Sequence, residues 1–221
     1  MRYLPAGNEN RRAFFYTYIY YMVLQIRWIA CVLISVVWLL AGCNGKKSTV
    51  LLLKADNISE DAFAIVAQTL RDTLGFSVDT GSMHQLPDSL WSSNRKRYRA
   101  EKLLQFLKFN HPEHTGARVI LVTDKDLGIV SGADSLRGAN GLSYQNGNFA
   151  VISDYRLHQY LRPQDSVNYY LSKVALHEAG HMLGLNHCKS IGCIMEAVEA
   201  KQHITTLKGF CPQCRKKLSQ M

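Results

Sequence analysis

The sequence predicts an α/β fold built on a mostly parallel sheet, from the type of its predicted elements and the order in which they follow one another. Short apolar segments of strand length alternate with longer segments of helical period, in the order strand, helix, strand, loop, helix, strand. This order is typical of a parallel sheet covered by helices, because each crossover between parallel strands needs a long connection. The chain has 221 residues and no visible internal repeat, which suits one domain with an N-terminal appendage.

The first predicted elements form a strand–helix–strand unit. Val50–Lys54 is an apolar run that we interpret as a buried strand. A helix follows, with Asn57 as its N-cap and Glu60 three residues later, the spacing of a capping box. Apolar residues then recur at helical spacing until Gly75, which we expect to end the helix. Phe76–Thr80 alternates between apolar and polar residues and is the second predicted strand.

The middle of the chain continues the same alternation. Arg95–Phe109 has the pattern of an amphipathic helix, and we interpret its basic run Arg95–Arg99 as the solvated face. Arg118–Thr123 is a third, apolar strand. Gly128–Gly147 is expected to be a long glycine-bearing loop, and loops of this length tend to be functional. Phe149–Ser153 is then a short strand.

The first 43 residues predict export. Arg27 precedes the uncharged apolar run Trp28–Ala41, which ends in Leu-Ala-Gly before Cys43. This ending resembles the bacterial lipoprotein signal, in which the cysteine receives a lipid. We therefore expect a signal peptide over residues 1–42, a tether over residues 43–49 and a catalytic domain over residues 50–221. Acylated Cys43 would anchor the protein to a membrane, on the periplasmic or cell-surface side.

An uncleaved transmembrane helix is the alternative for this segment. Its 14 apolar residues are short for a span, which needs about 20. The start of the chain is also open, since Met22 would give a more ordinary signal peptide than Met1.

The net charge of +9 falls to +6 after Cys43, because residues 1–42 hold four basic residues and one acidic residue. Such a mild excess indicates no particular partner. Aromatic and basic residues are not interleaved as in proteins that stack bases, so we expect no nucleic-acid partner. We expect a monomer.

A metal-binding pattern lies on the predicted helix Gln164–Leu183. His177 and His181 are four residues apart, so their imidazoles lie on one helix face and can reach one ion. Glu178 is placed to contact a metal-bound water. Gly184 ends the helix, and the turn after it brings back His187 as a third ligand.

Three histidines with an open fourth position are typical of a catalytic zinc site. Zinc lowers the pKa of a bound water from about 15.7 to about 7. Glu178 would take the proton of this water and pass it to the leaving amine. The pattern predicts a zinc-dependent peptidase that acts by Glu-assisted attack of a zinc-bound water.

Four further cysteines follow the histidines. Cys188, Cys193, Cys211 and Cys214 form the pattern C-x4-C and then C-x2-C, which can close a tetrahedral zinc site. Disulfides are an alternative, because an exported protein meets an oxidising compartment. A redox dithiol of Cys211 and Cys214 is another.

The run HEAGHMLGLNHCKSIGCIM, followed by FCPQC, resembles the archaemetzincin family. That family's pattern is HExxHxxGxxHC, a CxM after four residues, and a CxxC. Every position of the pattern is matched here from His177 to Cys214. Val122–Asp124, Gly141, Ser153 and Arg156–Leu157 resemble the family more loosely.

This resemblance implies a metzincin fold: a twisted, mostly parallel sheet with an antiparallel edge strand, an active-site helix, and a small zinc-stapled C-terminal subdomain. It implies two zinc ions, one catalytic and one structural, the second on the four cysteines. It makes Met195 the Met-turn residue beneath the catalytic site, followed by a connecting helix over Glu196–Leu207. The edge strand, which we match to Phe149–Ser153, would pair with a peptide or protein substrate. Ala197 and Val198 are candidates for the wall of the specificity pocket.

Two other functions are compatible with these residues. A zinc-binding lipoprotein without catalysis would use the same histidines, although it has no need of Glu178. A thiol–disulfide protein would use Cys211 and Cys214, although no predicted strand precedes them, as one usually does in redox motifs.

Overall fold

The computed structural model describes residue 22 and residues 48–111, 117–132, 135–197 and 206–220. The chain divides into two units, residues 1–46 and residues 47–221, and the fold below is that of the second unit. The predicted signal peptide, Met22 apart, and Cys43 lie outside the described residues. In the described part, no helix combines the length and apolarity needed to cross a bilayer.

The main sheet has five strands and is parallel except at one edge. Hydrogen-bonded neighbours follow the order β2 (Ser77–Met83), β1 (Thr49–Ala55), β5 (Arg118–Thr123), β9 (Phe149–Ser153) and β8 (Gly141–Ser143). The first four strands are parallel, and β8 pairs antiparallel with β9. This architecture confirms the predicted fold class.

The assignment of the edge strand was wrong. Phe149–Ser153 lies inside the sheet, parallel to β5, and the antiparallel edge is β8. Four of the five residues of β9 are buried, as expected for a strand covered on both faces. In contrast, the three residues of β8 are all half-buried, and one is glycine, so the sequence carries little strand signal there.

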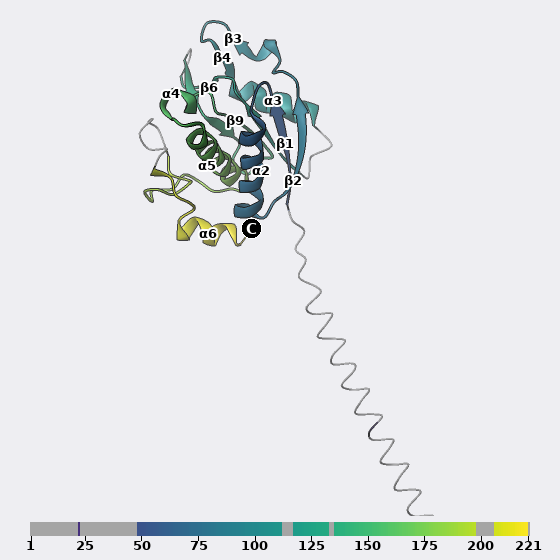
Figure 1. Ribbon diagram of the computed structural model, residues 1–221, viewed down its shortest axis with the longest axis vertical. Helices are drawn as coiled ribbons and strands as arrows, with labels where there is room; N and C mark the ends of the chain where they lie inside the picture. Colours follow the sequence, from purple (N-terminus) through teal and green to yellow (C-terminus); the bar gives the residue numbers. More distant parts are fainter. Residues whose placement is uncertain (1–21, 23–47, 112–116, 133–134, 198–205, 221) are drawn as a thin grey trace, which may run out of the picture. The chain divides into compact units, whose positions relative to one another are not determined.

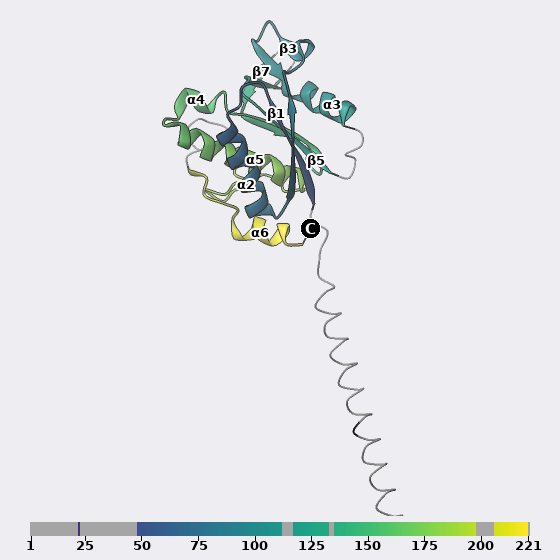
Figure 2. The same cartoon turned by 45° about the vertical axis from the view of Figure 1, so that its right-hand side comes forward.

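Helices cover both faces of the sheet. α2 (Glu60–Leu74) and α5 (Gln164–Met182) lie side by side on one face, and α3 (Ala100–Asn110) lies on the other (Figures 1 and 2). Successive side chains of β5 divide between the two layers: Ile120 and Val122 pack on the α2–α5 side, Val119 and Leu121 on the α3 side. This period of two explains why the central strands read as unbroken apolar runs.

The caps of α2 differ partly from expectation. Gly75 ends the helix in the left-handed conformation, as predicted. The N-cap is Ser59 and not Asn57, because the Ser59 hydroxyl accepts a hydrogen bond from the amide of Ala62 at 3.1 Å. The Asn57 side chain is instead directed to the Asp124 carboxylate, 3.4 Å away.

The basic run Arg95–Arg99 is not part of a helix, which corrects the prediction. The helix begins only at Ala100, and Arg97–Arg99 forms the short strand β4. Tyr98 is buried and packs edge-on against Trp91 of β3 (Trp91–Ser92), with ring centroids 5.1 Å apart. Burial of the Tyr98 ring in this small hairpin outweighs the helical charge pattern.

The segment predicted as one long loop contains three strands. β6 (Leu127–Val130) and β7 (Leu136–Ala139) join β3 and β4 in a second, four-stranded sheet, and β8 follows. Gly128 and Gly138 face each other across β6 and β7. A Cβ at Gly138 would lie 1.8 Å from the Arg156 guanidinium, so this glycine permits close packing and does not mark a loop.

The short helix α4 (Leu157–Tyr160) precedes α5, and α6 (Pro212–Leu218) lies at the C-terminal end. Isolated bridges join Cys188 to Glu196 and Cys193 to Gly209. Most of the predicted connecting helix, including Val198, lies outside the described residues. Its described ends, Glu196, Ala197 and Leu207, are not α-helical.

Candidate metal centre and substrate cleft

Three histidines converge at the C-terminal end of α5, as the spacing predicted. His177 and His181 lie one turn apart on the helix, and His187 returns from the turn after it. The Nε2 atom of His181 lies 3.1 Å from that of His177 and 3.2 Å from that of His187. The three side chains form one of two groups in the described residues that are able to hold a metal ion.

Hydrogen bonds orient two of these rings. Nδ1 of His177 donates to the carbonyl of Ile194 at 2.7 Å, and Nδ1 of His181 donates to the carbonyl of Leu185 at 2.8 Å. Since a carbonyl only accepts, Nδ1 carries the proton and Nε2 presents its lone pair. Burial lowers the pKa of both imidazoles, which favours the neutral form that binds metal.

The donor set fits zinc. In a tetrahedral site with Zn–N bonds of about 2.0–2.1 Å, ligand nitrogens lie about 3.3 Å apart. The Nε2 separations of 3.1 and 3.2 Å are close to that value. Three neutral imidazoles leave one position open for water or substrate.

Glu178 lies beside this group with its side chain buried. Its Oε2 atom accepts a hydrogen bond from the Ser143 hydroxyl at 2.6 Å, and Ser143 belongs to β8. Burial raises the pKa of Glu178, while the Ser143 hydrogen bond and the neighbouring His181 and His187 oppose this rise. The carboxylate is therefore held in one orientation between the helix and the edge strand.

Gly141 allows this close approach of β8 to the helix. A Cβ at position 141 would lie 2.8 Å from Oε1 and 2.9 Å from Cγ of Glu178. Any side chain there must displace either Glu178 or the strand. The sequence pattern contained no signal for this role.

For a peptidase in which Glu178 is the base, as the sequence pattern predicts, replacing Gly141 with Ala is expected to lower kcat/KM on the order of 10²-fold, because a displacement of about 1 Å at a reacting group costs that much. Steady-state kinetics measures this. Gly209→Ala is the matched control, because a Cβ there meets nothing within 4 Å. Equal rates for both variants would show that Gly141 does not set the position of Glu178.

Met195, the predicted Met-turn residue, packs against the helix that carries His177 and His181. Its side chain is fully buried, and its sulfur would lie 2.4 Å from a Cβ at Gly180, a residue of α5 between the two helical histidines. Its carbonyl accepts a hydrogen bond from the amide of Cys188 at 2.7 Å. Met195 thus contacts both α5, which carries two of the histidines, and the loop that carries His187.

The turn before His187 is held from the β8 side. The Asn146 amide donates to the carbonyl of His181 at 3.0 Å, and the Gln145 side chain donates to Asn186. Gly184 has a positive φ of 91°, and a Cβ there would meet the Asn146 side chain at 2.3 Å. Only glycine suits that position on both counts.

The four cysteines form the second group able to hold a metal ion. Sγ of Cys188 lies 3.7 Å from that of Cys211, and Sγ of Cys193 lies 3.8 Å from that of Cys214. In a tetrahedral site with Zn–S bonds of about 2.3 Å, sulfurs lie about 3.8 Å apart. No disulfide joins any two of these four cysteines in the structure.

The ionisation of these thiols is uneven when no cation is present. The backbone amide of Cys214 lowers the pKa of Cys211 to about 6, which favours its thiolate. Burial raises the pKa of Cys214 and of Cys193. Because thiolates this close repel one another, a bound cation is needed before all four can ionise together.

A cleft of about 800 Å³ runs past the histidines, between the β7–β8 segment and α5. Ala197 lines it, as expected for a wall residue. The sequence pattern did not indicate the other polar residues on its walls, because they come from separate elements that only the fold brings together; they are Arg137, Asn140, Ser143, Gln145, Arg156, Tyr160, Lys173 and Asn186.

Comparison with known proteins identifies the family. A model of peptidase family M54 matches residues 70–220. The archaemetzincin of Saccharolobus solfataricus is 32% identical over 155 residues, which cover 66% of this chain and 80% of the relative.

Solved structures agree in fold. The archaemetzincin of Methanopyrus kandleri, at 26% identity, has a TM-score of 0.66 over 81% of this chain and 97% of that one. A zinc-dependent peptidase from Methanocorpusculum labreanum, at 22% identity, has a TM-score of 0.65 over 76% of this chain and 99% of that one. The resemblance in the zinc motif thus extends across most of the domain, and the chain belongs to the archaemetzincins, peptidase family M54, as a zinc metallopeptidase.

Proposed function

We propose that the protein hydrolyses peptide bonds, with His177, His181 and His187 holding the catalytic zinc and Glu178 acting as general base. The observation that carries this proposal is the convergence of three Nε2 atoms beside a buried carboxylate. A non-catalytic zinc site has no use for a carboxylate in that position.

When bound, zinc supplies a Lewis acid that acidifies water and polarises a substrate carbonyl. Glu178 accepts the proton of the attacking water and later delivers it to the leaving amine. The Ser143 hydroxyl occupies Oε2 and leaves Oε1 to carry the proton. Because burial raises the pKa of Glu178, its carboxylate is a stronger base than one in water.

The substrate in this proposal is an extended peptide or protein segment. One side of β8 pairs with β9, and its residues Gly141–Ser143 also line the cleft. A peptide added at the free side of β8 gains backbone hydrogen bonds that do not depend on its side chains. Glu178 contacts β8, so a peptide that pairs with β8 lies beside the Glu178 carboxylate.

We further propose that Cys188, Cys193, Cys211 and Cys214 hold a second, structural zinc. Cys188 follows His187 directly, so this ion would fix the loop that carries the third histidine. Such support commonly changes the affinity or activity of a metal site by about 10–100-fold.

Cleavage of a broad peptide library by the full-length protein tests the enzymatic proposal. We expect cleavage that a chelator abolishes and added zinc restores. Metal analysis should give two zinc ions per chain. Two zinc ions without cleavage of any peptide would support the non-catalytic alternative, and one zinc ion with no free thiols would favour disulfides.

We also propose that the protein is exported and anchored through lipid on Cys43, on the support of the apolar run Trp28–Ala41 and its Leu-Ala-Gly-Cys ending. Expression in a bacterium fed labelled palmitate should label the wild type. Cys43→Ser is expected to abolish the label, and Cys31→Ser to retain it. An unlabelled wild type, or a labelled Cys43→Ser variant, would contradict the assignment.

A further inference from the structure

The charged side chains that line the cleft are mostly cationic. They are Arg137, Arg156 and Lys173, against Glu178 as the single acidic side chain among the described lining residues. Glu178 is committed to the reaction and is buried. The wall available to a substrate is therefore positive.

These cations gather at one end of the cleft. Two contacts give the direction of β8 relative to α5: Ser143 of β8 donates to the Glu178 carboxylate at 2.6 Å, and Asn146, three residues further on, donates to the carbonyl of His181. Asn140, just before β8, therefore lies toward the start of α5, and its side chain bonds the Tyr160 hydroxyl of α4 at 3.1 Å. Arg137 lies on β7, just before Asn140 in the chain, and Lys173 lies one turn before His177 on α5. Both therefore lie on the Asn140 side of the histidines.

The positive charge at this end is only partly neutralised within the protein. The buried Asp126 carboxylate accepts two hydrogen bonds from the Arg156 guanidinium, at 2.8 and 3.2 Å. It also forms an ion pair with Arg97 at 3.4 Å. Two guanidinium groups thus share one carboxylate. The Arg156 guanidinium is held against the backbone of Gly138, another lining residue.

Arg137 and Lys173 have no carboxylate partner within the described part of the chain. Arg137 is exposed on β7. The Lys173 ammonium donates to the carbonyl of Lys208 at 3.2 Å and lies 4.6 Å from the centre of the Tyr169 ring, and neither contact is with a carboxylate. Both residues line the cleft, so their charges act on a ligand bound there.

We propose that this end of the cleft selects substrates with acidic side chains, aspartate or glutamate, on the C-terminal side of the scissile bond. The proposal rests on the peptidase function above. The side follows from strand pairing. Antiparallel pairing with β8 is the more stable arrangement, and it directs the C-terminal part of the peptide toward the Asn140 end.

The test uses peptide pairs that differ only in Glu against Gln, placed in turn at positions on either side of the cleaved bond. Each exposed ion pair changes an affinity by up to about fivefold. With two or three cations, kcat/KM for the Glu peptide should exceed that for the Gln peptide by about tenfold on the C-terminal side. The ratio should fall toward one as ionic strength rises, because salt screens exposed charges.

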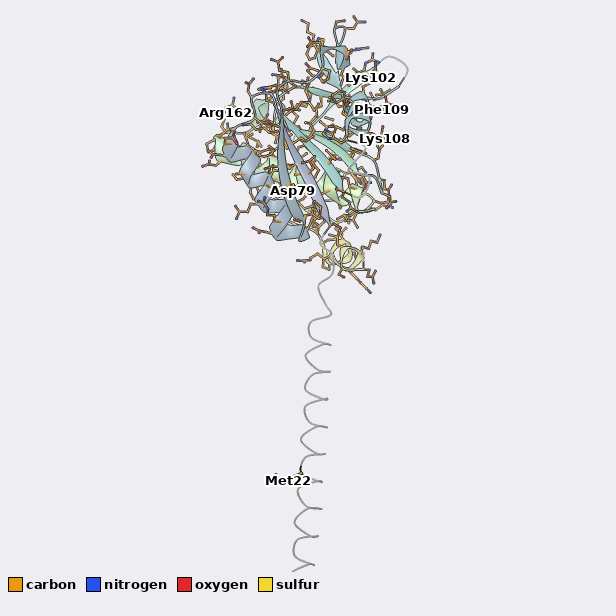
Figure 3. The ribbon with its side chains drawn as sticks, turned by 90° about the vertical axis from the view of Figure 1, so that its right-hand side faces the viewer. Met22, Asp79, Lys102, Lys108, Phe109 and Arg162 are labelled. Carbon is orange, nitrogen blue, oxygen red and sulfur yellow. The ribbon has the colours of Figure 1, made fainter. Side chains whose placement is uncertain are left out.

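Substitutions then assign the preference to residues. Arg137→Gln and Lys173→Gln should each lower the Glu-to-Gln ratio severalfold. Lys108→Gln is the matched control, with the same change in net charge. Lys108 is exposed on α3, does not line the cleft, and lies on the opposite side of the molecule from Arg162, which follows α4 (Figure 3). The control should keep the wild-type ratio.

A second readout separates this inference from the peptidase proposal. Binding of the fluorescent Glu and Gln peptides to zinc-loaded Glu178→Gln protein is compared by anisotropy. Equal cleavage of both peptides by the wild type would overturn the acidic preference and leave the peptidase proposal intact. If no peptide is cleaved, the peptidase proposal fails, and equal affinities for the two peptides overturn the acidic preference as well.

Discussion

Glu178→Gln is expected to lower kcat/KM for peptide cleavage by about 10²–10⁴-fold, the usual contribution of a general base. The amide has the same shape as the carboxylate and still accepts the Ser143 hydrogen bond, but it cannot take up a proton. Zinc content should not change, because the histidine nitrogens and not Glu178 form the ligand group. Steady-state kinetics and metal analysis on the same preparation measure both effects.

Glu60→Gln is the matched control, since it removes one carboxylate on α2 at a side chain that is 83% exposed. It should cleave at the wild-type rate. A Glu178→Gln variant within about threefold of the wild type, with zinc bound, would exclude Glu178 as the base. Loss of zinc from this variant would instead show that the carboxylate supports metal binding.

Cys214→Ser is expected to reduce the zinc content from two ions to one and to lower the thermal unfolding midpoint. Cys214 is buried among the other three sulfurs, and removing one of four ligands opens the group. Activity should also fall, by about 10–100-fold, because the loop that carries His187 and Cys188 is no longer fixed by the second ion. Metal analysis, thermal unfolding and kinetics each report one of these effects.

Cys31→Ser serves as the control, because Cys31 lies in the N-terminal segment and outside the four-cysteine group. It should keep two zinc ions and full activity. Retention of both zinc ions by Cys214→Ser would contradict the structural site. A loss of stability with no change in activity would show that the second site does not support His187.

Local patterns in the sequence were sufficient where one element carries the whole signal. The strands β1 and β5 are built on short apolar runs, and α5 has histidines at a helical spacing, so all three elements were predicted close to their observed bounds. The pattern failed for short elements that depend on distant partners. Tyr98 forms a strand because it is buried against Trp91, and nothing in Arg95–Arg99 itself indicates that contact.

The amino-acid sequence by itself determined the fold class, the two groups of side chains able to hold a metal ion and the candidate base, because these depend on residue types at fixed spacings along one or two segments. Only the tertiary structure decided which strand forms the edge, that Ser143 holds Glu178, and that Arg137 and Lys173 line one end of the same cleft. The last two features join residues that lie far apart in the chain, 35 positions between Ser143 and Glu178 and 36 between Arg137 and Lys173. Long-range packing of β8 against α5, which no local pattern encodes, brings them together.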